Sequence, residues 1–363
     1  MKRTYRILFF ALVLFSCKGH QMSEPSCSAQ YKSIDIPLEG KKYLASQLFD
    51  GCQIVELDTS KDSYIANIDR IYRDNRFIYI LDNRLHAVFI FDLGGKFIRR
   101  FYEIGRGPGE YIQLSDFLVD NRGRIYLMAD IPEKLIIRDS DGGMLEQRPL
   151  NESYMDFCIT EKNFVFANPP FSETSFSMQD TMTRNLKTGL CALPAYNSTF
   201  IRGRFLTDTD GKIVLVRRFD NRIYSIENEE IVVLGEIHFK DASFITKSEL
   251  KEFGDSNKFF DSCRDNNRIF SFVDFQIMDD IWVYNTNLPF CSIYSSTSGK
   301  IYTISFLDDQ EKQIHLGGHS RIAINGKTNR EVCFVLKQEA LRQMEKKETD
   351  NPILFFYHLR NDL

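Results

Sequence analysis

The sequence lacks the short motifs that mark several classes of enzyme and metalloprotein. Its eight cysteines include no CxxC pair, and there is no HExxH, no GxSxG and no GxxxxGK[ST] segment. Zinc-ribbon, redox, zincin, serine-hydrolase and P-loop chemistry therefore have no support. His315 and His319 are four residues apart, but two glycines between them argue against a helix that would direct both at a metal. We expect no metal and no other cofactor.

Positive charge is also too sparse for a protein that binds nucleic acid. The 363 residues include 46 Lys and Arg against 50 Asp and Glu, and the basic residues form no cluster. Binding to a phosphate backbone needs such a cluster, so we expect no nucleic-acid partner. Only one Trp is present, but 31 Phe and 16 Tyr favour β-strands.

The one apolar run at the amino terminus is too short to be a membrane span. Lys2, Arg3 and Arg6 precede the apolar residues 7–15, which cannot cross a hydrocarbon core of ~30 Å as a helix. The run ends in Ser16-Cys17, and a small residue before a cysteine at this position resembles a bacterial lipobox. We predict a signal peptide over residues 1–16 and lipidation at Cys17. The alternative is an ordinary signal peptide with a coincidental cysteine.

The residues after this signal predict the location of the protein. Lys18 follows Cys17, where an Asp would favour inner-membrane retention in many bacteria, so we expect an outer-membrane lipoprotein that faces the periplasm or the cell surface. Removal of residues 1–16 takes away three basic residues and no acidic one, which changes the net charge from −4 to −7. Residues 17–33 are polar and predict a flexible tether, so that only the N-terminal lipid contacts the membrane.

Seven cysteines remain after Cys17, and an odd number leaves at least one thiol unpaired or bonded to another molecule. Cys158 and Cys333 lie in apolar, strand-like runs, and we predict that both are core residues.

Short apolar strands recur along the rest of the chain. Most are followed by a polar turn, a second strand and a Gly-containing turn such as FDLGGK or SSTSGK, in which Gly supplies the positive φ of a tight hairpin. Each unit then predicts a four-stranded antiparallel sheet of roughly 45 residues. The six copies of the leading strand are residues 77–81, 124–128, 163–167, 212–216, 280–284 and 331–336.

Six such sheets bury both their faces when they are arranged radially, so residues 34–363 predict an all-β, six-bladed β-propeller. The last strand, 353–357, has no room for a fourth strand after it, while segment 52–57 has no partner in its own unit. We predict that these two segments pair and close the ring, which removes exposed sheet edges. Short helical insertions are expected in 246–263 and 337–347.

The segment 44–111 resembles a particular group of proteins, the six-bladed β-propeller lipoproteins of Bacteroidota, which are similar in architecture to NHL-type propellers. A strand that ends in FD, a Gly-Lys turn and then GRGPGEY (105–111) carry the resemblance. The clear match covers 44–149, and the later units match only in strand pattern. Most members of this group have no assigned activity, so the resemblance implies a fold and a location more than a function.

The GRGPGEY segment links the first two units, and two interpretations of it remain open. In one, its glycines form turns and an Arg106–Glu110 pair braces the loop. In the other, the loop lies at the rim and presents Arg106 and Tyr111 to a ligand.

One polar position per unit falls into register on the strands that line the centre. Three acids and three arginines alternate imperfectly there, and they predict a ring of bidentate Arg–carboxylate pairs that brace one another. A polar ligand at the channel mouth, anionic or a sugar, is a second interpretation, and a metal-dependent site is a third, although arginines would repel Ca²⁺. The six residues are Arg70, Asp116, Asp156, Arg204, Asp274 and Arg321.

We expect a non-enzymatic binding or scaffold module that presents a propeller face to an envelope protein, peptide or glycan. The alternative is a metal-dependent hydrolase or lyase of the lactonase kind, which rests on analogy of fold alone.

Overall fold

The computed structural model describes residues 25–363, with gaps at 170–171, 173, 189–203, 241–243, 246–255 and 337–350. The predicted signal peptide, Cys17 and the predicted helix at 337–347 lie outside the described residues. The described residues are mostly β-strand, with few helices: α1 (Ala45–Leu48), α2 (Ser256–Asp265) and the 3-10 turn η2 (Gly318–Ser320). None of the described helices is long and apolar enough to span a bilayer.

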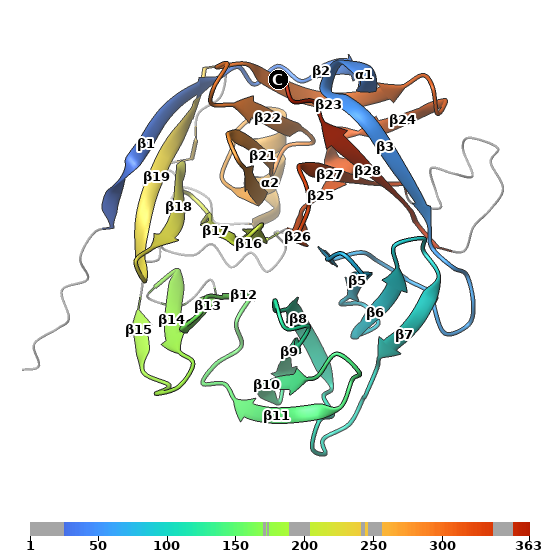
Figure 1. The fold of residues 1–363 in the computed structure, drawn as a ribbon. Helices are drawn as coiled ribbons and strands as arrows, with labels where there is room; N and C mark the ends of the chain where they lie inside the picture. Colours follow the sequence, from blue (N-terminus) through green and yellow to red (C-terminus); the bar gives the residue numbers. More distant parts are fainter. Residues whose placement is uncertain are drawn as a thin grey trace, which may run out of the picture.

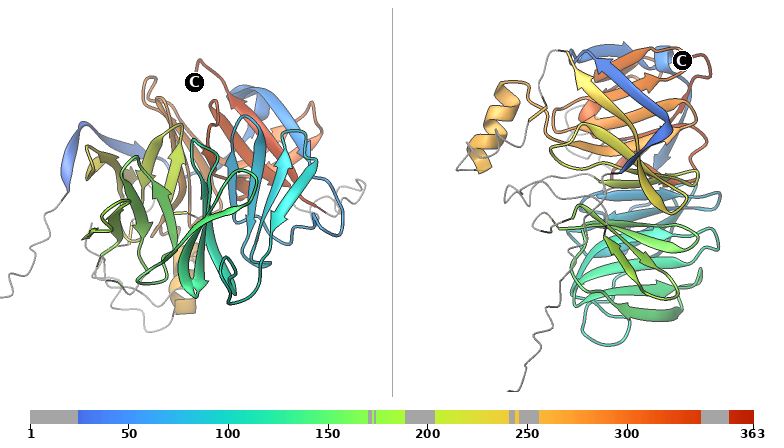
Figure 2. Two further views of the ribbon diagram at one scale, coloured as in Figure 1. Left: turned by 60° about the horizontal axis from the view of Figure 1, so that its bottom comes forward. Right: turned by 90° about the vertical axis from the view of Figure 1, so that its left-hand side faces the viewer.

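The strands form antiparallel sheets that follow one another around a common centre (Figure 1). The first strand of a sheet, such as β8 or β12, lies near the centre, and later strands, such as β11 or β15, lie at the periphery. The two side views show the same stacked arrangement, with α2 projecting from one face (Figure 2). This is the β-propeller-like architecture that the repeats predict.

The first sheet shows why the sequence folds in this way. Its two central strands carry mostly apolar side chains on both faces of the sheet, and these side chains are almost completely buried. The Gly95 of FDLGGK has a φ of +91°, which a tight hairpin needs and which residues with a side chain rarely adopt. The strands are β4 (Arg70–Arg73), β5 (Phe77–Asp82), β6 (Ala87–Asp92) and β7 (Phe97–Phe101).

The same meander recurs along the chain, and each of the six predicted copies of the leading strand overlaps a strand of the structure. The second and third sheets are β8 (Gln113–Val119), β9 (Ile125–Ile131), β10 (Glu133–Arg138), β11 (Met144–Pro149) and β12 (Asp156–Ile159), β13 (Asn163–Ala167), β14 (Phe176–Asp180), β15 (Leu186–Thr188). Next come β16 (Leu206–Thr209), β17 (Lys212–Leu215), β18 (Arg222–Glu227) and β19 (Glu230–Phe239). They are followed by β20 (Phe272–Met278), β21 (Ile281–Thr286), β22 (Cys291–Ser295), β23 (Ile301–Asp309) and β24 (Ile314–Gly317), and then by β25 (Arg321–Ile322), β27 (Glu331–Leu336) and β28 (Ile353–Leu359).

A short strand near the centre joins two of these units. β26 (Ile324–Gly326) pairs in parallel with β4 on one side and touches β16 at Thr209 on the other. The strands β4–β7 and β16–β19 are thereby linked in one ten-stranded sheet. The described strands form five sheets instead of six separate ones, because β26 connects two four-stranded arrays.

The N-terminal segment runs along the outer edges of three consecutive sheets. Its strands are β1 (Ser26–Ile36), β2 (Lys41–Leu44) and β3 (Phe49–Glu56). β1 pairs in parallel with β19, β2 pairs in parallel with β23, and β3 pairs antiparallel with β28. We call residues 26–56 the outer strap.

Two predictions about this segment have different outcomes. The predicted pairing of segment 52–57 with strand 353–357 is confirmed, because β3 pairs with β28 over most of its length. The predicted tether is too long, because residues 26–33 lie in β1. Backbone hydrogen bonds to β19 hold this polar stretch, and its alternating sequence shows little of the apolar pattern that reveals a buried strand.

The hydrophobic core consists of clusters that lie between neighbouring sheets. One cluster joins the first sheet to the second, and the next joins the second to the third. A large cluster connects the strands from β13 to β21, and another connects β20–β23 to β27 and β28. A further cluster brings β28 and β3 against β5 and β6 of the first sheet. Cys158 and Cys333 are fully buried in these clusters, as predicted.

The strap depends on a close approach at Gly235 in β19. A Cβ atom built at Gly235 would lie 2.3 Å from the Lys32 carbonyl oxygen in β1, whereas one built at Gly51 in β3 meets no atom within 4 Å. We therefore expect Gly235→Ala to displace β1 and to lower the free energy of unfolding by about 1–3 kcal/mol. Gly51→Ala is the matched control and should change stability little.

The sole tryptophan provides the readout. Trp282 is buried, and the Lys32 Nζ atom lies 6.0 Å from the centre of its ring. Thermal unfolding and the emission spectrum of Trp282 should both change in the Gly235→Ala variant. If the two variants unfold at the same temperature with the same emission, β1 does not depend on this contact.

Candidate functional site

All six charged residues predicted to line the centre are buried. Five lie in the first strand of their units, and Arg204 comes two residues before β16. Their role in ligand binding stays a prediction. The exposed fractions are 0% for Arg70 and Asp116, 3% for Asp156, 5% for Arg204, 7% for Asp274 and 2% for Arg321.

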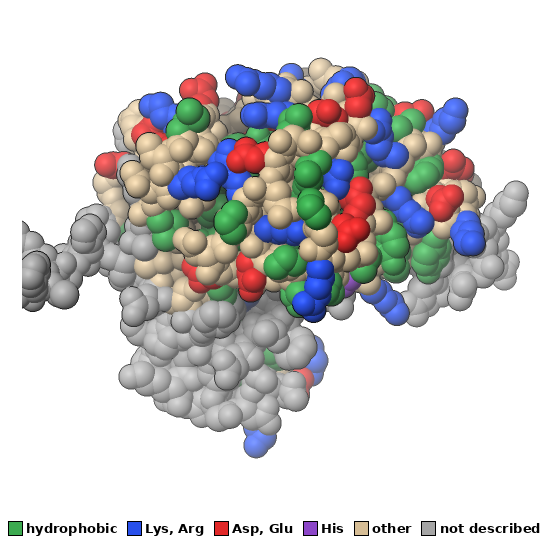
Figure 3. All heavy atoms as spheres, turned by 90° about the horizontal axis from the view of Figure 1, so that it is seen from below, with side chains coloured by type: hydrophobic (Ala, Val, Ile, Leu, Met, Phe, Trp, Pro, Cys, Tyr) green, Lys and Arg blue, Asp and Glu red, His purple; other side chains and the backbone are tan. Residues whose placement is uncertain are grey.

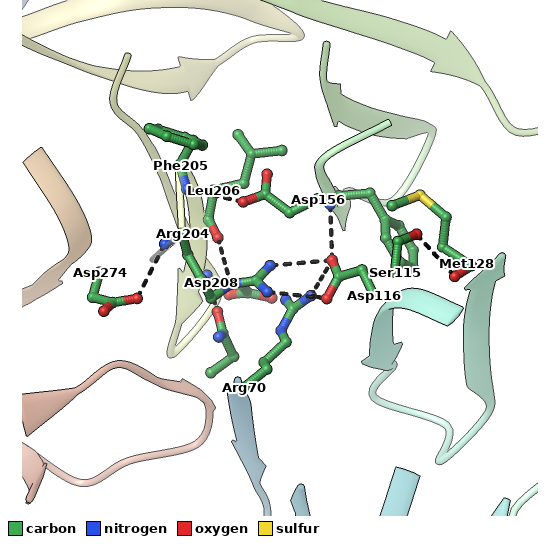
Figure 4. A network of polar contacts seen from close by, with 12 residues as sticks. Arg70, Ser115, Asp116, Met128, Asp156, Arg204, Phe205, Leu206, Asp208 and Asp274 are labelled. Atoms are coloured by element: carbon green, nitrogen blue, oxygen red, sulfur yellow. Dashed lines mark hydrogen bonds and ion pairs between the residues drawn. The ribbon is translucent and has the colours of Figure 1, made fainter. Parts of the chain in front are cut away.

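Asp116 is the centre of the polar network (Figure 4). Arg70 Nη1 donates to both of its carboxylate oxygens, and the Arg204 guanidinium donates to the same two atoms at 3.0 and 3.2 Å. The Phe157 amide donates a further hydrogen bond of 3.0 Å. Burial alone would raise the pKa of Asp116, but Arg204 and Arg70 outweigh this effect and lower it. Asp116 is therefore an ionised carboxylate shared by two arginines from different units.

The network continues from Arg204 to the fifth unit. The Arg204 amide donates to Asp274 Oδ1 at 3.2 Å, and the Asp274 amide returns a hydrogen bond of 3.0 Å to the Arg204 carbonyl. Asp274 has a φ of +52°, within an irregular part of β20, and this left-handed conformation turns its peptide group toward Arg204. Arg321 donates to the Asp274 carbonyl oxygen and to Gln276 Oε1.

Asp156 differs from the other two aspartates because one of its carboxylate oxygens is buried without a hydrogen-bond partner. Its Oδ2 accepts a hydrogen bond of 2.9 Å from the Phe205 amide, but its Oδ1 is buried without a hydrogen bond. Burial raises the pKa of Asp156 to about 6, and the nearby Arg204 opposes this shift only in part.

These contacts limit what the centre does chemically. The two oxygens of Asp116, the most fully bonded carboxylate, already face guanidinium groups, which repel a cation. Within the described residues, no group of three or more His, Cys, Asp or Glu side chains is placed to hold a metal ion. His315 pairs with Asp308 at 2.9 Å, and His319 lies in η2. The predicted Arg–carboxylate pairing is thus found at Asp116, whereas Asp156 and Asp274 accept hydrogen bonds from backbone amides instead.

The GRGPGEY loop is braced differently from either sequence interpretation. Glu110 does not pair with Arg106 but accepts a hydrogen bond of 2.8 Å from the Gly107 amide. Arg106 is exposed, and within the described residues it forms no ion pair. Arg138 supports the loop from below through a 3.2 Å hydrogen bond to the Gly109 carbonyl.

The prediction that Tyr111 is displayed to a ligand is wrong. Its side chain is fully buried among the apolar residues between the first two sheets, and its hydroxyl donates to the Phe101 carbonyl at 3.3 Å. The aromatic ring therefore anchors the loop to the core. Of the two residues predicted to face a ligand, Arg106 and Tyr111, only Arg106 is exposed.

Sequence reasoning missed several members of the central network because they have no equivalent in other units. Gln276 donates to the Ile324 carbonyl at 2.8 Å and to Thr209 at 3.2 Å, and it thus connects Arg321 to β26. Asn325 accepts a hydrogen bond of 2.8 Å from the Asp208 amide. No repeat position points to these contacts, since they depend on the central placement of β26.

Removal of the negative charge should affect stability in opposite ways at Asp116 and at Asp156. Asp116→Asn leaves two buried arginines without an anionic partner, and we expect a loss of about 3–5 kcal/mol in the free energy of unfolding at pH 7.5. Asp156→Asn removes a poorly compensated buried charge while it keeps an oxygen for the Phe205 amide. We expect this variant to be at least as stable as the unchanged protein at pH 7.5.

The pH dependence distinguishes the two cases. The folded protein holds the proton of Asp156 more tightly than the unfolded chain, because the pKa is about 6 against an ordinary value of 3.8. The ionised form therefore lowers stability progressively as pH rises from about 4 to 6, and any advantage of Asp156→Asn should disappear at pH 4. Melting temperatures at both pH values test this, and an Asp156→Asn variant that is clearly less stable at pH 7.5 would contradict it.

Two solved bacterial proteins have a fold similar to this one. A protein of Bacteroides fragilis predicted to be exported is 18% identical, with a TM-score of 0.75 over 91% of this chain and 99% of its own. A member of the DUF4221 family from Bacteroides vulgatus is 10% identical, with a TM-score of 0.52 over 86% of this chain and 97% of its own. At these identities the likeness concerns the fold alone.

A streptogramin B lyase also aligns, at 10% identity and a TM-score of 0.47 over 88% of this chain and 100% of its own, which is too low to support an argument about activity. A comparison with curated proteins gave no match. One family model spans residues 32–358, and therefore nearly all of the sheets and the network at their centre. The chain belongs to that family, which is described as a domain of unknown function, DUF4934.

Proposed function

We propose that this protein is a lipid-anchored binding module of the bacterial envelope, a six-bladed β-propeller whose ring is closed through β3 and β28. It acts without catalysis and presents a rigid rim to a protein partner at the outer membrane, facing the periplasm or the cell surface. A peptide or a glycan is the other kind of partner that the proposal admits. Support for the ring comes from the core clusters, since the last one returns to the first sheet.

The observation that carries the binding role is the rigid loop 102–112 with its exposed side chains. The buried Tyr111 ring and the hydrogen bond from the Gly107 amide to Glu110 hold the loop, while Tyr102 is 51% and Ile104 45% exposed. Arg106 is exposed beside them. Tyr and Arg are the residue types that most often dominate protein interfaces, and a rigid loop loses little entropy on binding.

The neighbouring edge strand extends the same surface. Met144 and Leu145 of β11 are 47% and 55% exposed, and a Cβ built at Gly109 would lie 3.1 Å from the Met144 sulfur, which places the loop against this strand. Figure 3 views the molecule from the side on which β10 and β11 lie in Figure 1, and it shows hydrophobic side chains among charges of both signs. Such a mixed surface suits a protein partner better than a highly charged polymer.

Hydrolase or lyase chemistry at the centre has no specific observation in its favour. Such a site would need carboxylates free to bind a metal or activate water. Asp116 is shared by Arg70 and Arg204, so its lone pairs are already used.

A charge reversal at the loop tests the binding surface. We expect Arg106→Glu to reduce recovery of the partner when the mature protein is used to capture envelope proteins, with mass spectrometry as the readout. Arg264→Glu is the matched control, since Arg264 is an exposed arginine on α2, far from the loop in sequence. Equal recovery of every captured protein by the two variants would exclude loop 102–112 as the binding surface.

The proposed anchor is tested separately. Cys17→Ser should move the protein from the membrane fraction to the soluble fraction and abolish labelling by radioactive palmitate. Cys27→Ser is the control, because Cys27 is an exposed free cysteine only ten residues further along the chain. Labelling that persists in the Cys17→Ser variant would contradict a lipid at this residue.

A further inference from the structure

Arg218, in the link between β17 and β18, has an unusual environment for an arginine. Its guanidinium lies over the Phe205 ring at 5.0 Å, and its Nη2 atom lies 3.6 Å from the Met155 sulfur. Its Nε is buried without a hydrogen-bond partner, and no carboxylate of the described residues pairs with it. The residue as a whole is half-buried, and no ion pair among the described residues neutralises its guanidinium.

The lack of an anionic partner is specific to Arg218, because the neighbouring arginines have one. Asp220, the nearest acid in sequence, receives hydrogen bonds from Arg217 and from Arg222, the latter at 3.1 Å. It also accepts a hydrogen bond of 2.6 Å from the Tyr224 hydroxyl. Asp220 is therefore fully used by other donors, and Arg218 is left without a counter-ion.

An unused acceptor lies next to this unused donor. Asp156 follows Met155 in the chain, and the Phe205 amide holds its Oδ2, so both residues that touch Arg218 also fix the position of Asp156. The Oδ1 atom of Asp156 is buried without a partner. Burial lowers the pKa of Arg218 to about 10 and Asp156 offsets this only in part, so the two groups interact without forming an ion pair.

The unsatisfied atoms define the chemistry of a ligand. A planar guanidinium favours a carboxylate, which it binds in a bidentate manner. An unpartnered carboxylate oxygen needs a hydrogen-bond donor, and it would repel a doubly charged anion such as phosphate. A carboxylate that carries an adjacent hydroxyl satisfies both requirements at once.

We propose that Arg218 and Asp156 form a binding site for a small hydroxy-carboxylate, such as an acidic sugar, with the carboxylate on the Arg218 guanidinium and a hydroxyl that donates to Asp156 Oδ1. This site goes beyond the function proposed above. It belongs to the third and fourth units, whereas loop 102–112 connects the first two, so either site stands or fails without the other.

Titration of the mature protein with three probes, observed by ligand NMR, tests this site. D-glucuronate should bind at least about tenfold more tightly than acetate, which offers only the carboxylate, and than D-glucose, which offers only hydroxyls. Equal binding of glucuronate and acetate, or of glucuronate and glucose, would overturn the proposal.

Variants separate the two roles. Arg218→Gln should weaken glucuronate binding by about 10- to 100-fold, the range expected for loss of a charged hydrogen-bonding partner. Arg218→Lys keeps the charge but loses the planar guanidinium group. Its affinity for glucuronate should lie between those of the unchanged protein and Arg218→Gln, so the site can still be tested if the Gln variant folds poorly. Arg264→Gln is the matched control and should bind as the unchanged protein does. Unaltered affinity in both Arg218 variants would refute the site.

Asp156→Asn tests the hydroxyl contact. It converts the unpartnered acceptor atom into a donor, so the preference for glucuronate over acetate should fall while acetate binding remains. A preference that does not change would show that Asp156 takes no part.

Discussion

Backbone hydrogen bonding at the edges of the sheets is the constraint on which this structure depends. Every antiparallel unit ends in an outer strand with one row of unpaired amide and carbonyl groups, which is a site for unwanted association. The outer strap covers β19, β23 and β28 in succession, and each contact joins residues more than 200 positions apart in the sequence. The pairing of β3 with β28 also joins a segment near the start of the described chain to the last strand.

At the centre, buried charged side chains connect the units, as backbone hydrogen bonds do at the edges. Asp116 connects Arg70 of one unit to Arg204 of another, and the peptide contacts of Asp274 extend the connection to a third. The donors and acceptors of this network bond to other groups of the protein. Their hydrogen-bonding capacity is therefore used within the fold before it is offered to a ligand. Features suited to recognition lie elsewhere: at the braced loop 102–112, and at Arg218, where the internal pairing is incomplete.

Much of this architecture could be predicted from the sequence because the repeats share one pattern. The bounds predicted for β13 and β27 agree with the structure, since turn residues flank compact apolar runs. The pairing of β3 with β28 followed from counting strands that lacked partners. The six charges predicted to line the centre are all buried, because they lie in the first strand of their units or, for Arg204, just before it.

The features that were missed depend on contacts between units. β1 and β2 are polar edge strands held by backbone bonds, so their side chains carry little signal. The interpretation that displays Tyr111 at the rim fails because its ring fills the space between two sheets, a contact that the loop sequence does not reveal. Nothing in the sequence separates Arg218 from Arg217; the difference arises because only Arg217 reaches Asp220.

The parallel alignment of β1 with β19 has a mechanical consequence. When a strand is pulled along its own length, the load falls on all of its ladder bonds together, whereas a strand peeled from one end loses them one at a time. A chain attached ahead of residue 26 and pulled along β1 would load this ladder in shear, in a strand whose Ile34 and Ile36 side chains are also buried. Force applied in this direction would therefore be resisted by the whole ladder together.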